Sequence, residues 1–112
     1  MSNEFEKTLK SITNKKLEEI ISEQIRKLLP VETFVIVLST EFVFVVSDEV
    51  ASGKAGGYVV LQSKDNNITI TSPFIARIYV KKKHVSINVC FHPISPSTDE
   101  CIAQLPISYE AS

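Results

Sequence analysis

One row of polar side chains in this sequence contains residue types that could bind a metal or act in catalysis. The residues of one parity between positions 84 and 92 share one face of a predicted strand; they are His84, Ser86, Asn88, Cys90 and His92. A thiol beside two imidazoles is a donor set for zinc or a setting for a cysteine nucleophile. Same-face neighbours lie ~7 Å apart, so only Cys90 and His92 could share a metal, with Cys101 as a third ligand if the C-terminal segment folds back. We therefore interpret this row as a solvent-facing or interface-facing polar surface, and expect no catalytic residue, metal or cofactor.

Basic residues gather around a predicted turn at Lys82-Lys83. Together with one aromatic residue they form a group that we call the basic hairpin: Arg77, Tyr79, Lys81, Lys82, Lys83 and His84. The chain as a whole carries a formal net charge of −1, so it has no global attraction for nucleic acid. Locally, lysines could bind phosphates while Tyr79 stacks on a base. Lysine-rich turns also keep hairpins soluble and deter edge pairing, which makes nucleic-acid or anion binding the alternative function here.

The three glycines of the chain lie close together, at Gly53, Gly56 and Gly57. A phosphate-binding P-loop requires the order Gly-x4-Gly-Lys-Ser/Thr between a strand and a helix. Here the order differs and a strand follows. We therefore interpret residues 47–57 as a flexible connection whose surface is available to a partner.

The early strands contain more apolar residues than one buried face requires. Two strands are predicted, Thr33–Leu38 and Phe42–Val46, joined by a tight turn at Ser39-Thr40, and in both strands residues of both parities are apolar. One helix covers only one face of a sheet, so a set of valines is left over: Val35, Val37, Val43 and Val45, or their opposite-parity neighbours. An exposed apolar patch marks an interface. Self-association is the favoured interpretation; internal closure of the sheet and an open cavity for an apolar ligand are the alternatives.

A helix is predicted from Asn3 to Leu29, where Pro30 ends it. Its two halves carry apolar residues that point in different directions, so either the helix breaks near Thr13-Asn14 or its first half packs against something different from its second half. The alternative is that residues 1–13 form a mobile arm, or one exchanged between subunits.

Two hairpins and a C-terminal segment complete the predicted elements. A tip at Asp65-Asn66 places Leu61 opposite Ile70 and Gln62 opposite Thr69. A turn at Lys82-Lys83 pairs Val80 with Val85 and Arg77 with Asn88. The capping-box pattern of Ser97 to Glu100 predicts a short helix that ends near Leu105, and a terminal strand is the competing interpretation.

These elements predict one α+β domain over residues 1–112: a long N-terminal helix on an antiparallel meander of about six strands, with a short C-terminal helix. A helix before an antiparallel meander also occurs in cystatin-like folds and small secretion chaperones, a likeness of architecture that transfers no residue role.

The expected location is cytoplasmic, without membrane association. The N-terminus has no apolar segment typical of a signal peptide, and the longest apolar stretch is far short of the ~20 residues that a spanning helix needs. Cys90 and Cys101 are expected to be reduced. The expected function is that of a small non-enzymatic protein, a homodimer that acts through protein–protein contacts.

Overall fold

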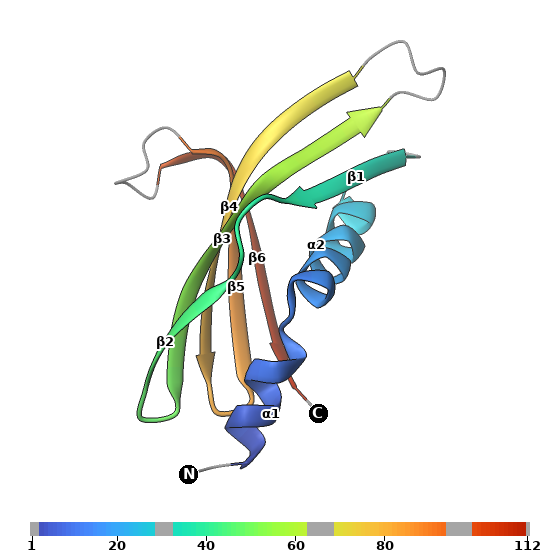
Figure 1. The fold of residues 1–112 in the computed structure, drawn as a ribbon. Helices are drawn as coiled ribbons and strands as arrows, with labels where there is room; N and C mark the ends of the chain where they lie inside the picture. Colours follow the sequence, from blue (N-terminus) through green and yellow to red (C-terminus); the bar gives the residue numbers. More distant parts are fainter. Residues whose placement is uncertain (1–2, 29–32, 63–68, 94–99, 112) are drawn as a thin grey trace.

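Two helices lie on the concave side of one curved, six-stranded antiparallel sheet in the computed structural model of this chain (Figure 1). The structure describes residues 3–28, 33–62, 69–93 and 100–111. The elements are α1 (Asn3–Ser11), α2 (Asn14–Leu28), β1 (Thr33–Leu38), β2 (Val43–Ser47), β3 (Val50–Gln62), β4 (Thr69–Lys81), β5 (His84–Pro93) and β6 (Cys101–Glu110). The predicted α+β class, with an antiparallel sheet of about six strands, is confirmed.

The predicted single long helix is wrong, because two shorter helices, α1 and α2, take its place. They are separated at Ile12-Thr13, beside the position where a break was one of the two possibilities. The backbone N–H of Lys16 donates to Thr13 Oγ1 at 3.2 Å, so Thr13 caps the new helix. Both apolar sets are buried: Phe5 and Ile12 from the first segment are 3% and 4% exposed. Residues 3–12 therefore pack against the core of their own chain here, and an exchange between subunits stays a prediction.

The long strand β3 pairs with three other strands. β4 runs along its whole length on one side, whereas β1 and β2 follow one another along its opposite edge, at residues 57–62 and 50–54. The predicted hairpin between the first two strands is wrong, since they do not pair with each other. The backbone N–H groups of Ser39 and Thr40 both donate to the Gly56 carbonyl O, at 2.8 and 3.3 Å, so the chain steps along the edge without reversing.

The glycine-rich segment is strand, not the flexible connection that its composition predicted. All three glycines lie inside β3. Gly57 belongs to the inner, helix-facing side, where a Cβ would overlap the Val37 carbonyl O and lie 3.1 Å from Leu38 Cα and from Phe74 Cζ. The missing side chain therefore allows β1 and the Phe74 ring to approach closely.

Replacing Gly57 by alanine is expected to lower the free energy of unfolding by about 1–3 kcal/mol, because backbone and ring must both move. Gly56→Ala is the matched control, since its Cβ would meet Thr40 Oγ1 at an ordinary 3.4 Å; we expect a change within about 0.5 kcal/mol. Urea denaturation measures both. Equal effects at the two positions would contradict the packing explanation.

The predicted hairpin registers are confirmed. Leu61 lies opposite Ile70, and Gln62 opposite Thr69. Val80 lies opposite Val85. Arg77 also pairs with Asn88 as predicted, and the second hairpin turns at Lys82, whose φ is +54°. The predicted tip at Asp65-Asn66 lies outside the described residues.

The C-terminal helix prediction is wrong, because residues 101–110 form the edge strand β6. Leu105 pairs with Val89 and Ile107 with Ile87, and both are buried on the inner side. Pro106 lies between them, a residue that an edge strand tolerates because one side of it needs no ladder hydrogen bond. Of the predicted capping box, Ser97–Asp99 lie outside the described residues.

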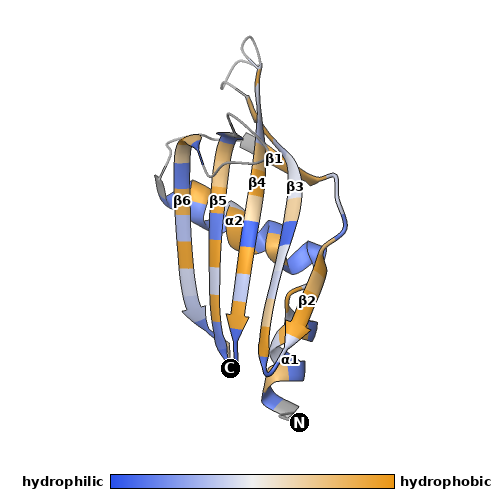
Figure 2. Cartoon of the chain, turned by 90° about the vertical axis from the view of Figure 1, so that its left-hand side faces the viewer, coloured by the Kyte–Doolittle hydropathy of each residue, from blue (hydrophilic) through white to orange (hydrophobic). Residues whose placement is uncertain are grey.

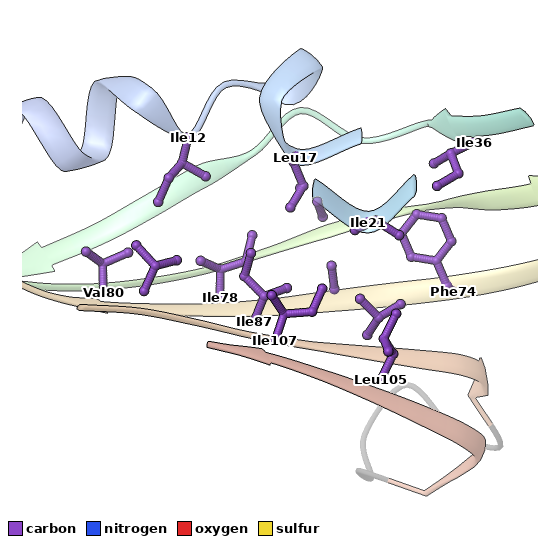
Figure 3. Packing of buried hydrophobic residues seen from close by; sticks show 14 of the residues in the cluster. Ile12, Leu17, Ile21, Ile36, Phe74, Ile78, Val80, Ile87, Leu105 and Ile107 are labelled. Carbon is purple, nitrogen blue, oxygen red and sulfur yellow. The ribbon is translucent and has the colours of Figure 1, made fainter. Parts of the chain in front are cut away.

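The core lies between the two helices and the inner face of the sheet (Figure 3). Leu17 and Ile21 of α2 are fully buried, and Ile12 closes the core beside α1. The strands contribute alternate residues, every second one buried; β4 supplies Ser72, Phe74, Ala76, Ile78 and Val80. This arrangement leaves the opposite face of the sheet without a helix.

Candidate functional site

Figure 2 looks onto the sheet face that is turned away from both helices. Several large apolar side chains of this face are exposed. All four valines that were predicted to be left over lie on this face, together with two tyrosines. We call these six residues the outer apolar patch: Val35, Val37, Val43, Val45, Tyr58 and Tyr79. The most exposed are Val43 and Val45, at 70% and 74%. Within this chain the sheet does not roll up to cover them, so the internal-closure alternative fails for these residues.

Strand pairing divides the patch into two groups. Val37 lies opposite Tyr58, and Val45 lies opposite Ser52, which in turn pairs with Tyr79. Lys54 and Arg77, which lie opposite one another on β3 and β4, stand between the two groups. A shallow hollow of about 700 Å³ is lined by Val43, Val45 and Tyr79 together with polar residues that include Lys54 and Arg77. A surface that mixes apolar and polar side chains is compatible with a protein interface.

The structure separates the six residues of the basic hairpin into two groups. Arg77 and Tyr79 belong to the outer face, whereas Lys81–His84 surround the β4–β5 turn. Two carboxylates from distant parts of the sequence lie beside that turn. Lys83 Nζ is 3.2 Å from Glu4 Oε1, and His84 Nδ1 is 3.0 Å from Glu110 Oε1. These carboxylates offset part of the positive charge on which phosphate binding would depend.

The sequence did not predict that a hydroxyl, an imidazole and a carboxylate lie in series across β5 and β6. Ser108 Oγ lies 3.3 Å from His84 Nε2, and His84 Nδ1 lies 3.0 Å from Glu110 Oε1. This is the order of groups in a serine-hydrolase triad. The alternation of Ser108 and Glu110 could have revealed it, had the C-terminal segment been assigned as a strand in register with β5.

The surroundings of this series do not suit catalysis. All three side chains are exposed, so water competes for their hydrogen bonds. The hollow that contains His84 and Glu110 is lined by Glu4 and Lys81–Lys83, and Ser108 does not line it. A substrate bound there would therefore not lie over the hydroxyl. We interpret the series as a polar cross-strand ladder.

The two cysteines are joined in a disulfide, so the expectation of reduced thiols is wrong. Cys90 and Cys101 have a Cα–Cα distance of 5.5 Å, within the usual range for a disulfide. A sulfur atom in a disulfide is neither a thiolate nucleophile nor a zinc ligand. Among the described residues, no three His, Cys, Asp or Glu side chains are grouped so that they could hold a metal ion.

Tyr109 lies on the inner side of β6, where its phenol is partly buried. Burial disfavours the charged phenolate and raises the pKa of Tyr109 above its ordinary value of 10.0. The phenol is therefore protonated at neutral pH and is poorly suited to act as a general base.

No protein-family model, curated protein or solved structure matches this chain. In the part of the chain that the structure describes, no helix has both the length and the apolar character needed to cross a membrane.

Proposed function

We propose that this protein is a small non-enzymatic protein that acts through protein–protein contacts, and that it forms a homodimer through the outer apolar patch. The observation that supports the proposal is the exposure of Val43, Val45 and the half-exposed tyrosines on the sheet face that is turned away from both described helices. Exposed apolar surface of this kind marks interaction sites on proteins.

The energy available from the patch is of the magnitude that dimerisation requires. Burying an exposed valine contributes about 1–2 kcal/mol, and a tyrosine contributes a similar amount through its ring. Two copies bring twelve such side chains, for a gross gain on the order of 10–20 kcal/mol, against an association cost of about 4–15 kcal/mol. The surplus is compatible with a dimer of moderate affinity.

A second copy is the occupant that the geometry favours. Two sheets pack face to face at ~10 Å when each presents an apolar face, and a two-fold axis places the same patch on both sides. Such a pair would bury the face that is left open in the single chain, and would form a sandwich with α1 and α2 on its two outsides.

Replacing Val43 and Val45 together by glutamate is expected to convert the dimer to a monomer, because a dry interface would then contain four unpaired carboxylates. Sedimentation equilibrium over a wide range of concentration measures the effect, with 12.5 kDa as the monomer mass. The matched control is Val46→Glu, which changes an exposed residue of the same strand with the opposite parity; this variant should stay dimeric. A wild-type chain that remains monomeric at high concentration, or a double variant that still dimerises, would overturn the proposal.

A further variant of the same protein distinguishes this proposal from the alternative, a nucleic-acid- or anion-binding accessory protein. Replacing Lys81, Lys82 and Lys83 by alanine should leave dimerisation unchanged. If the alternative holds, a gel-shift titration against salt will show binding whose salt dependence weakens in this variant. A cytoplasmic location also stays a prediction, and the disulfide argues against it, since disulfides are rare in cytosolic proteins.

A further inference from the structure

A cavity of about 350 Å³ lies on the helix-facing side of the sheet, opposite the outer apolar patch. It opens beside Ile25, towards the C-terminal end of α2, where the strands continue past the helix (Figure 1). Its apolar lining comes from α2 and four strands: Ile25, Val59, Leu61, Ile70, Phe91 and Leu105. Small-molecule sites in proteins are concave, mostly apolar and of about 300–1,000 Å³.

The cavity exists because small side chains occupy positions that face it. On the inner side of β4, Ser72 stands between Ile70 and Phe74, and on β6 Ala103 lies opposite Phe91. Nearer the N-terminal end of α2, the side chains of Leu17 and Ile21 fill the space between the helix and the sheet. Ile70 is 53% exposed although its inward parity directs it to this cavity, which indicates an opening to solvent.

The Ser72 hydroxyl is the feature that points to a ligand. Ser72 is only 9% exposed and lines the cavity among apolar side chains. The one hydrogen bond that the described residues give this hydroxyl is a long one, 3.4 Å to the Pro73 carbonyl O. A serine hydroxyl also has two acceptor lone pairs, which can accept a hydrogen bond from a polar group on a bound molecule.

Of the polar residues that line the cavity, Ser72 is the best placed to form a hydrogen bond with a bound molecule. Gln104 Oε1 accepts a hydrogen bond from Asn88 Nδ2, 3.3 Å away on the outer side of the sheet, so its amide is directed away from the cavity. His92 lies near the end of β5, and the described residues that line the cavity include no carboxylate and no lysine. The environment therefore favours a neutral head group, because an unpaired charge would lose its hydration there.

We propose that this cavity binds a small neutral amphiphile, an aliphatic chain with one hydroxyl-type head group that exchanges a hydrogen bond with Ser72. A volume of about 350 Å³ corresponds to about a dozen water molecules at ~30 Å³ each, so a ligand of about ten non-hydrogen atoms fits. The site is independent of dimerisation, since it lies on the opposite side of the sheet from the patch.

The test uses 1-octanol as the probe and methyl-labelled full-length protein, with NMR chemical-shift titration as the measurement. Saturable shifts are expected at the methyl groups of Ile25, Ile70 and Leu105, and none at Val43 or Val45. Ser72→Ala retains the space but removes the hydroxyl, so binding should weaken about tenfold. Ser72→Leu fills the space and should abolish binding. Should Ser72→Leu not fold, Ala103→Leu at the exposed mouth replaces it, with the same expected loss.

Three results would overturn this proposal: shifts that do not saturate, shifts centred on the outer apolar patch, or a Ser72→Ala variant that binds as tightly as the wild type. Titration of the Val43→Glu, Val45→Glu double variant separates this site from the proposed dimer. The cavity should bind 1-octanol equally well in that variant, whatever its oligomeric state.

Discussion

Replacing Phe74 by alanine is expected to lower the free energy of unfolding by about 3–5 kcal/mol, the largest single-residue effect on stability that we expect in this fold. Phe74 is 2% exposed and is the largest fully buried side chain (Figure 3). Its ring lies over Gly57, at the end of β1, and its centroid is 6.3 Å from that of Phe91. Truncation would therefore leave a void that touches three strands. Since small domains are stable by about 5–15 kcal/mol, the variant would be close to unfolding.

Urea denaturation followed by far-UV circular dichroism measures this loss. Ile102→Ala provides the control, because Ile102 is a large apolar residue of the same sheet that is 74% exposed. Its replacement should change the free energy of unfolding by no more than about 0.5 kcal/mol. A loss below about 1 kcal/mol for Phe74→Ala would mean that the ring does not occupy the central position described above.

Removing the Cys90–Cys101 disulfide is expected to cost about 3 kcal/mol. The cross-link closes a loop with a sequence separation of 11, and the entropy lost by the unfolded chain on closing such a loop corresponds to roughly that value. Cys90 is fully buried in β5, and Cys101 begins β6, so the bond ties the edge strand to its neighbour at the end where the connection between them leaves the sheet. Without it, β6 would be held by its ladder hydrogen bonds and by inward residues such as Leu105.

The double variant Cys90→Ala, Cys101→Ala provides the measurement, in urea denaturation with and without reductant. Reductant should destabilise the wild type to about the level of the double variant, and should leave the double variant unchanged. If the double variant were as stable as the oxidised wild type, the disulfide would add nothing to the stability of the folded chain.

Local sequence patterns predicted the elements whose pairing is local. The register of the β4–β5 hairpin was predicted correctly because both strands carry apolar residues at every second position. A two-residue turn places both apolar sets on the same face of the sheet. The break between α1 and α2 was likewise predictable, because Phe5 and Leu17 require different helix faces to be buried.

Elements whose form depends on distant partners were predicted wrongly. Gly53 and Gly57 argue against a strand in isolation, yet β4 and the edge strands hold them in extended conformation. The close approach of β1 requires Gly57, and that of β2 requires Gly53. Pro106 hides the alternation of Leu105 and Ile107 from a local analysis, and only the ladder with β5 makes the strand evident.

The candidate sites also differ in how far the sequence could predict them. An excess of apolar residues of both parities in the first two strands was enough to predict an uncovered set of side chains. The tertiary structure was needed to decide that this set includes Val35, Val37, Val43 and Val45 rather than their opposite-parity neighbours. The cavity beside Ile25 could not be foreseen, because its lining comes from α2 and four strands that only the tertiary structure brings together.

The turn between β2 and β3 determines which side of the sheet β2 presents to water. Val43 and Val45 face outward, while Phe44, paired with Gly53, faces inward and contacts the Phe42 ring edge-on, at 4.1 Å between centroids. Ser47 pairs with Val50, and the two turn residues between them, Asp48 and Glu49, both have positive φ. Because side chains alternate along a strand and a hairpin turn fixes its register, lengthening this turn by one residue would exchange the two sets. One residue added to the segment 39–42 would instead be absorbed outside β2, so the two corners of this strand differ in the changes of length that they tolerate.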